Sequence, residues 1–251
     1  MPIFTKHGSA STPGALIAEA KGLDQLRQAL NQCGNHYLRV PNVFKVTETT
    51  LETSEIRVQS ASQAQMVQLG KGLAQLHHIK QPHYGLNEDN FIGLNPQANK
   101  ISQNWGDFFV TNRLQYQVSL IKQHSVRGEF DKILSSLQHK LIDFLNLHCE
   151  HASLVHGDLW SGNVLFDQDS VWLIDPAIYY ADREVDLAMT EMFGGFSRAF
   201  YQSYDSEYPR TAAYQQKKVF YNLYHFLNHY NLFGNSYLPA CEAGFNALGS
   251  L

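Results

Sequence analysis

Apolar residues recur at steps of three and four positions along much of the chain, the spacing that places them on one face of an α-helix. The first such stretch begins at Ala15 and ends at the pair Gly34-Asn35, residue types that often close a helix. The second runs from Ser62 to His78. Further helices are predicted over residues 105–122, 130–147, 182–192, 196–204, 212–233 and 237–248. The pattern therefore predicts one helix near the N-terminus and a mainly helical remainder.

Short apolar runs predict two groups of strands. The first group lies near the N-terminus, at residues 2–6, 40–46 and 56–58. The second is a hairpin of two buried strands, 164–166 and 171–174, joined by a turn of Asp, Gln, Asp and Ser. Residues 85–96 are rich in Asn and Gly, and we expect them to form a loop.

Together these elements predict an α+β fold with two unequal lobes. Residues 1–60 would form a reduced N-terminal lobe, made of a small antiparallel sheet and one helix. Residues 61–251 would form a large, mainly helical C-terminal lobe that contains the hairpin. A chain of 251 residues is long enough to bury a sizeable core in this arrangement.

The composition narrows the classes of function. A net charge of −4 provides no basic field for nucleic acid or for an anionic membrane. The three cysteines lie far apart, without the paired spacing of a zinc site or a redox dithiol. No apolar run has the length of a membrane span, and the N-terminus lacks a leader pattern. We expect a soluble cytoplasmic protein, either a monomer or a weak dimer.

Candidate chemistry is concentrated around the predicted hairpin. The sequence HGDLWSGN, residues 156–163, precedes its first strand, and Asp175-Pro176 follows its second. The hairpin would bring Asp158, Asn163 and Asp175 together, so that two carboxylates and an amide oxygen converge. Such a set suits a magnesium ion together with a base for phosphoryl transfer. The alternative is that these residues only cap turns, which is the usual explanation of a single Asp or Asn.

Several motifs in this order resemble the fructosamine kinase (ketosamine 3-kinase) family. That family belongs to the aminoglycoside-phosphotransferase branch of the protein-kinase-like fold. The catalytic-loop motif is the HGDLWSGN of residues 156–163. The other matching motifs are YGLNEDNFIG (84–93), WGDFF (105–109), IDPAIYYADREVDLAM (174–189), FGGF (193–196) and YNLYHFLNHYNLFG (221–234). The resemblance implies a two-lobed, kinase-like fold and ATP-dependent phosphorylation of a ketosamine hydroxyl, with the ketosamine free or protein-bound.

The resemblance also implies roles for residues that would bind ATP and Mg²⁺. Asp158 would be the catalytic base that deprotonates the attacking sugar hydroxyl. Asn163 and Asp175 would bind the magnesium ion that bridges the nucleotide phosphates. Lys6 matches the family's strand lysine, which contacts the phosphates, and Glu19 matches the helix glutamate that pairs with this lysine.

Further residues would contact the acceptor or support the loop. Trp160 would offer an aromatic wall to the sugar or its amine substituent. Asp186 would support the catalytic loop from behind, accepting hydrogen bonds from its backbone or from His156.

Three more residues are candidates for the acceptor site, each with an open alternative. Asp89 and Asn90 lie in a segment that the family places near the substrate, although a plain turn would explain them equally. Arg183 is placed to reach a phosphate or phosphosugar, or else to pair with Glu184 or Asp186 at the start of a helix.

The N-terminal stretch departs from the family pattern. Family members open with two strands joined by a Gly-rich loop that covers the phosphates, whereas this sequence begins at what would be the third strand. Gly8 and Gly14 come after Lys6 rather than before it, and residues 52–60 copy the family's adenine-binding strand and hinge poorly. The sequence is thus interpreted as a shortened kinase, a truncated kinase or a protein that no longer catalyses.

Three functions therefore remain open. The first is a ketosamine kinase, and the second is a phosphotransferase that acts on an aminoglycoside or an amino alcohol. The third is a pseudokinase or binding module without catalysis.

Overall fold

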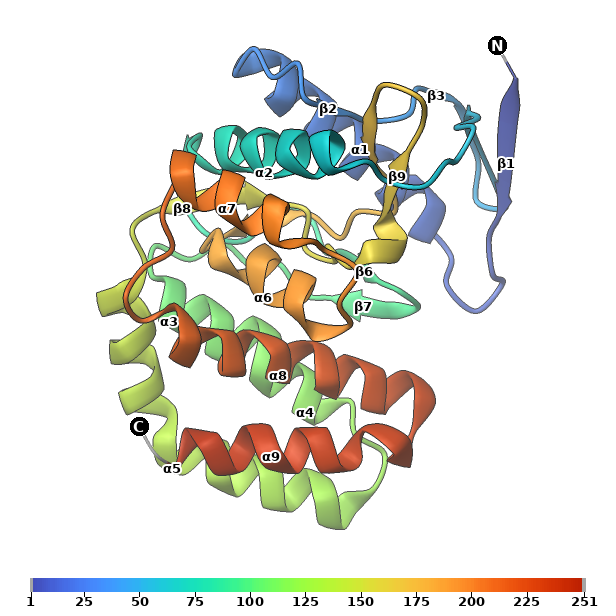
Figure 1. The fold of residues 1–251 in the computed structure, drawn as a ribbon. Coiled ribbons are helices and arrows are strands. Elements are labelled where there is room, and N and C mark those ends of the chain that lie inside the picture. Colours follow the sequence, from blue (N-terminus) through green and yellow to red (C-terminus); the bar gives the residue numbers. More distant parts are fainter. Residues whose placement is uncertain (1, 250–251) are drawn as a thin grey trace.

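A small antiparallel sheet and one long helix form the N-terminal part of the computed structural model, which describes residues 2–249 (Figure 1). The strands are β1 (Ile3–His7), β4 (Thr50–Ser54) and β3 (Val43–Val46), in the order β1-β4-β3. Helix α1 (Ala15–Gln32) contacts β3 and β4, and its leucines at steps of three and four are buried, as predicted. Strand β1 lies at the edge of this sheet.

The strand predicted at residues 56–58 is wrong, because the third strand of the sheet is Thr50–Ser54. Leu51 and Thr53 of this strand are buried, so it alternates as a half-buried strand does. Ile56 and Val58 instead belong to a segment without regular secondary structure that lines a cavity. These apolar residues are explained by their place in the cavity wall, not by a place in a sheet.

The predicted hairpin is confirmed as β9 (Val164–Phe166) and β10 (Val171–Leu173). Strand β2 (Leu38–Arg39) adds to it, pairing parallel with β10. The N-terminal part and the hairpin share one hydrophobic core with α2 (Gln63–His77) and α7 (Arg198–Glu207). Because this core crosses residue 60, the boundary between lobes at that residue stays a prediction.

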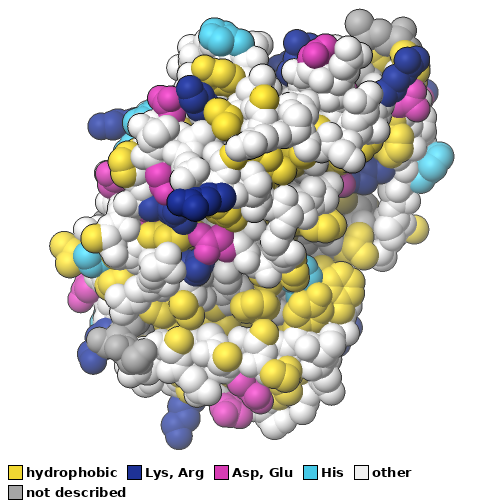
Figure 2. All heavy atoms as spheres, viewed as in Figure 1, with side chains coloured by type: hydrophobic (Ala, Val, Ile, Leu, Met, Phe, Trp, Pro, Cys, Tyr) yellow, Lys and Arg dark blue, Asp and Glu magenta, His cyan; other side chains and the backbone are white. Residues whose placement is uncertain are grey.

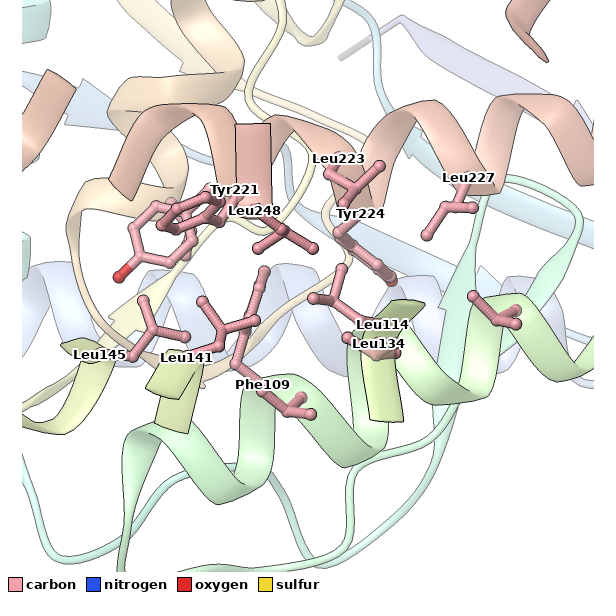
Figure 3. Close-up of a cluster of buried hydrophobic side chains, with 14 of the residues drawn as sticks. Phe109, Leu114, Leu134, Leu141, Leu145, Tyr221, Leu223, Tyr224, Leu227 and Leu248 are labelled. Atoms are coloured by element: carbon pink, nitrogen blue, oxygen red, sulfur yellow. The ribbon is translucent and has the colours of Figure 1, made fainter. Parts of the chain in front are cut away.

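The helices of the larger part enclose a second core, which Figure 3 shows in close-up. Leucines of α5 (His124–His148) and α9 (Leu238–Leu248) meet aromatic residues of α8 (Tyr214–Phe233) there. The predicted helix at 105–122 is three consecutive segments, α3 (Trp105–Phe109), the π-helical turn η1 (Val110–Gln115) and α4 (Tyr116–Ser119). The other helical segments are α6 (Glu184–Met192) and the 3₁₀ turns Ser161–Asn163 and Asn235–Tyr237.

Short strands between the helices carry the segments that surround the site. Strands β11 (Tyr179–Ala181), β8 (Ala152–Val155) and β5 (Lys80–Gln81) form one sheet. Strands β6 (Asn90–Ile92) and β7 (Asn95–Gln97) form a hairpin where a loop was expected. The prediction of a loop was wrong because polar side chains of this hairpin form buried hydrogen bonds. Strands that bury polar residues lack the alternation of apolar and polar residues from which strands are predicted.

The structure confirms an α+β fold with a small sheet-bearing part and a larger helical part. Within residues 2–249, no helix is both long and apolar enough to cross a membrane.

Candidate active site

The loop that follows β8 is held from behind by one buried carboxylate. Asp186, on α6, accepts hydrogen bonds from the backbone amides of His156 (2.7 Å) and Gly157 (2.9 Å). Gly157 has a φ of 81°, and a Cβ there would lie 2.1 Å from the carbonyl oxygen of Ala177. Only glycine leaves room for the Ala177 carbonyl in this conformation, so residue 157 has to be glycine for the loop to follow this path. These are the contacts expected of Asp186, and its supporting role stays a prediction.

A buried histidine and tyrosine complete the support of Asp186. Nε2 of His77 lies 3.2 Å from a carboxylate oxygen of Asp186, and its Nδ1 lies 2.9 Å from the Tyr204 hydroxyl. Burial acts to raise the pKa of Asp186, but the hydrogen bond and charge of His77 and the amide of His156 outweigh it, and the pKa lies below its usual value. Asp186 is therefore ionised at neutral pH.

His156 lies inside the loop as a neutral ring with a fixed tautomer. Its Nε2 is 2.9 Å from the carbonyl of Ile174, which can only accept, so Nε2 carries the proton. Its Nδ1 accepts a hydrogen bond from the Asp158 amide at 3.3 Å. Burial lowers the pKa of His156, in agreement with a neutral ring. His156 thus ties the start of the loop to the end of β10.

The predicted base and its neighbouring amide are in contact. Nδ2 of Asn163 donates to the Asp158 carbonyl at 2.9 Å and lies 3.2 Å from the Asp158 carboxylate. Burial raises the pKa of Asp158 to about 7; the Asn163 hydrogen bond opposes this rise, and the charges of Asp175 and Asp186 add to it. A carboxylate with this pKa is suited to accept a proton near neutral pH.

Asp175 meets the predicted lysine–glutamate pair from the N-terminal part. Nζ of Lys6 lies 2.8 Å from a carboxylate oxygen of Glu19 and 2.9 Å from one of Asp175. Burial, assisted by the charge of Asp175, raises the pKa of Glu19 to about 7 against the attraction of Lys6. Burial also acts to raise the pKa of Asp175, but Lys6 holds it below its usual value. The Lys6 ammonium group therefore forms ion pairs with both carboxylates.

These residues line a single cavity of about 250 Å³ between the two parts of the fold. Its lining includes Lys6, Glu19, Asn90, Phe91, Asp158, Trp160, Asn163 and Asp175. A second cavity of about 210 Å³ shares Lys6, Glu19 and Asp175 with it, and its apolar walls come from the small sheet, α1, the segment at residues 56–58 and the hairpin with the residue that follows it. Those apolar residues, Phe4, Leu23, Leu51, Val58, Leu165 and Ile174, were not predicted as site residues. Single apolar residues on separate elements leave no motif that a sequence could reveal.

The site can hold a divalent cation, because its oxygen donors face the same cavity. The Asp175 carboxylate is 43% exposed there. Nδ2 of Asn163 is occupied by the Asp158 carbonyl, whereas its Oδ1 accepts no hydrogen bond from residues 2–249. A carboxylate and a free amide oxygen are ligands that magnesium prefers.

Trp160 lies at the open side of the cavity. Its indole ring folds over Gly162, where a Cβ would lie 2.2 Å from the ring, so a larger residue there would push the ring aside. The ring of Phe193 lies 6.4 Å away, and that of His229 lies 5.5 Å beyond Phe193. Figure 2 shows hydrophobic side chains gathered on the right of the view, around the end of α6.

The structure brings only part of the predicted acceptor residues to the cavity. Asn90 lines it, whereas Asp89 is exposed outside it and accepts a hydrogen bond from the Asn99 amide at 2.7 Å. Asp89 thus lies outside this cavity, and its contact with a substrate stays a prediction.

Arg183 is not brought to the cavity, which contradicts its predicted contact with substrate. It is 2% exposed, and its guanidinium lies 3.5 Å from the ring centre of Tyr208. It donates to Glu150 at 3.0 Å and lies 3.9 Å from Glu184. The pairing with Glu184 was the stated alternative, and burial among these partners explains why Arg183 cannot reach a ligand.

The fold and the site define a protein of the protein-kinase-like class. The structure of an aminoglycoside phosphotransferase in complex with gentamicin shares this fold, with a TM-score of 0.58 at 14% identity over 99% of this chain and 85% of that one. The chain belongs to the fructosamine kinase family, whose sequence model matches residues 1–248. The crystal structure of a candidate fructosamine-3-kinase from Haemophilus somnus matches with a TM-score of 0.86 at 27% identity, over 98% of this chain and 83% of that one.

Curated relatives bear names of the same family. A candidate ketoamine kinase of Synechocystis is 46% identical over 67% of this chain and 57% of its own length. A chloroplastic protein-ribulosamine 3-kinase of Arabidopsis thaliana is 34% identical over 93% of this chain and 72% of its own length. The chain spans less than two thirds of the Synechocystis protein and of similar relatives from Vibrio and Lactiplantibacillus, at 57%, 62% and 63%.

Proposed function

We propose that the protein is an ATP-dependent kinase that phosphorylates a sugar hydroxyl of a ketosamine, free or protein-bound. The observation that carries this proposal is the convergence of Lys6, Asp158, Asn163 and Asp175 on one cavity. The names of its relatives, ribulosamine 3-kinase and ketosamine-3-kinase, support the choice of acceptor.

Residues on the two sides of the cavity would have different roles in the reaction. The apolar second cavity would take the adenine, and Lys6, held by Glu19, would contact the phosphates. Asn163 and Asp175 would hold a magnesium ion, which offsets the charge of the phosphates when bound. Trp160 would form a wall for the acceptor.

Asp158 would take the proton of the attacking hydroxyl. As the oxygen of the acceptor bonds to the γ-phosphorus, the bond to the β-phosphate oxygen breaks and ADP leaves. The pKa of about 7 lets Asp158 be ionised before the reaction and still accept the proton during it.

The test is turnover of ATP with a fructosamine and with a ribulosamine, comparing wild type with Asp158→Asn. The variant should lose about 10²- to 10⁴-fold in kcat, the usual contribution of a general base. Asp169→Asn, an exposed aspartate in the turn of the same hairpin, is the matched control and should retain wild-type activity.

Three results would contradict the proposal in different ways. Equal activity of Asp158→Asn would exclude Asp158 as the base. Phosphorylation of an amino alcohol or an aminoglycoside, with no ketosamine turnover, would change the acceptor class. Absence of a thermal shift with millimolar Mg·ATP would indicate a binding module, because a ligand at a hundred times its Kd stabilises by about 2.7 kcal/mol.

A further inference from the structure

A fully buried arginine, Arg113, lies behind the cavity on the π-helical turn η1. Its Nη1 donates to the carbonyls of Ala98 and Asn112, and its Nη2 donates to Oδ1 of Asn99 at 2.8 Å. Its guanidinium carbon lies 3.9 Å from the ring centre of Tyr179. Among the residues that the structure describes, no carboxylate forms an ion pair with it, and its Nε has no partner. A buried charge without a counter-ion is costly, so this position calls for a reason.

A directed chain of amide hydrogen bonds begins at this arginine. Nδ2 of Asn99 donates to Oδ1 of Asn90 at 2.7 Å, and Nδ2 of Asn90 donates to the carbonyl of Ile178 at 2.9 Å. Arginine can only donate and a carbonyl can only accept, so both amides are oriented without ambiguity. Each link therefore points away from the charge of Arg113, the arrangement in which successive hydrogen bonds strengthen one another.

A second branch joins the same chain. Nε2 of Gln97 donates to Oδ1 of Asn90 at 2.8 Å and to the carbonyl of Ala177 at 3.0 Å. Oε1 of Gln97 accepts from the hydroxyl of Tyr224 at 2.7 Å, and Figure 3 shows Tyr224 extending from α8 toward the turn that carries Leu114. Asn90, Gln97 and Asn99 will be called the amide relay.

The amide relay ends on the segment that carries Asp175. Ala177 and Ile178, whose carbonyls it holds, follow Asp175 by two and three residues. Asp175 has a φ of 51°, a left-handed conformation that strains a residue with a side chain. On its other side the Ile174 amide donates to the Asn163 carbonyl at 3.1 Å. The strained residue is therefore fixed at both ends.

We propose that Arg113 is a positioning residue that acts through the amide relay to hold Asp175 ready for a divalent cation. This inference rests on the proposed function in one respect, namely that the cation is the one that accompanies a nucleotide. Arg113 touches neither cation nor substrate. Removing Arg113 would leave the Ala98 carbonyl and Oδ1 of Asn99 without this donor, which lowers stability, so cation binding has to be measured beside stability.

The test compares Arg113→Met, Arg113→Lys and Asn99→Ser with wild type. Binding of Mn²⁺ in the presence of ADP, followed by electron paramagnetic resonance, should weaken about 10- to 100-fold in Arg113→Met, as for other groups that orient metal ligands. Amide hydrogen exchange should become faster across residues 174–181. Arg113→Lys and Asn99→Ser should show the same changes to a smaller degree. In turnover assays kcat should fall, whereas KM for the acceptor should stay within about twofold, because no acceptor contact is removed.

Trp105→Phe is the matched control. Trp105 is also buried, lies on the neighbouring helix α3 and loses a 2.9 Å hydrogen bond to Tyr221, but it donates no hydrogen bond to the amide relay. It should keep wild-type Mn²⁺ affinity and wild-type exchange across residues 174–181.

The inference is overturned if Arg113→Met binds Mn²⁺ as wild type does, or if Trp105→Phe loses as much affinity at the same Tm. If Arg113→Met does not fold, Arg113→Lys and Asn99→Ser decide by the same two measurements. If the wild-type protein binds Mn²⁺ and ADP but phosphorylates no ketosamine, the proposed acceptor class is refuted. The role of Arg113 is then still decided by the Mn²⁺-binding and hydrogen-exchange measurements on the variants.

Discussion

The two sides of the cavity are built in different ways. The loop at residues 156–163 is fixed by backbone hydrogen bonds to Asp186, which is fully buried with His77 and His156. The side formed by the N-terminal sheet depends on Lys6, whose side chain is 34% exposed on the edge strand β1 and is held by ion pairs. Buried networks specify one geometry, whereas ion pairs that water still reaches contribute less stability. The proposed base is thus held in place by the core, while the proposed phosphate contact of Lys6 can be changed with little effect on folding.

Of the variants that test this difference between the two sides, Asp186→Asn should have the largest effect. An amide cannot accept from both backbone N–H groups and from His77, so the free energy of unfolding should fall by about 3 kcal/mol. Urea unfolding measures this loss. Asp143→Asn, at an exposed position of α5, is the control and should leave stability unchanged. Wild-type stability of Asp186→Asn would mean that the loop is held by other contacts.

Lys6→Met tests the opposite side. Nucleotide affinity should fall about 10- to 100-fold, the contribution of hydrogen bonds to a charged group, while unfolding free energy changes by less than about 1 kcal/mol. Titration calorimetry with Mg·ADP and urea unfolding give the two numbers. Lys45→Met, an exposed lysine of the same sheet, controls for the loss of one positive charge. A large loss of stability in Lys6→Met alone would remove the contrast between the two sides.

The smallest effect concerns the dependence of stability on pH. Burial raises the pKa of Glu19 to about 7, so the folded protein binds a proton that the unfolded chain releases near pH 4.5. Protonated Glu19 therefore favours folding, and this contribution is lost as pH rises from about 4.5 through 7. Glu19→Gln should flatten that decline in urea unfolding at pH 5 and pH 7.5.

Glu242→Gln, an exposed glutamate on α9, is the control for Glu19→Gln. Asp158, whose pKa is also raised to about 7, adds a decline of the same sign, so Glu19→Gln should reduce the slope without abolishing it. A slope equal to that of wild type would show that Glu19 keeps an ordinary pKa.

The sequence predicted those features that are local and periodic. The leucines of α1 and the strands on both sides of the turn at 167–170 are confirmed because a single face of each element is buried. The motif at 156–163 predicted the cluster of Asp158 and Asn163 because the two residues lie five positions apart in one short loop.

Features that depend on distant partners were missed. Arg113 would be taken from sequence for a helix surface residue, yet its partners come from residues 98–99 and from Tyr179. Arg183 was predicted either to reach a phosphate or to pair with Glu184 or Asp186, whereas the structure surrounds it with Glu150, Tyr204 and Tyr208 as well. Such contacts are set by how helices pack, which no local pattern records.

The left-handed backbone of Asp175 also bears on how this protein can change during evolution. Among residues 2–249 it is the one non-glycine residue with a positive φ. Asparagine and glycine tolerate this conformation best, and each is a single-nucleotide change from an aspartate codon. Both would keep the fold while removing the charge. Under the proposed mechanism, a lineage can therefore lose the reaction in one mutational step and still inherit a folded protein, which makes position 175 the first to inspect when an active relative is to be told from an inactive one.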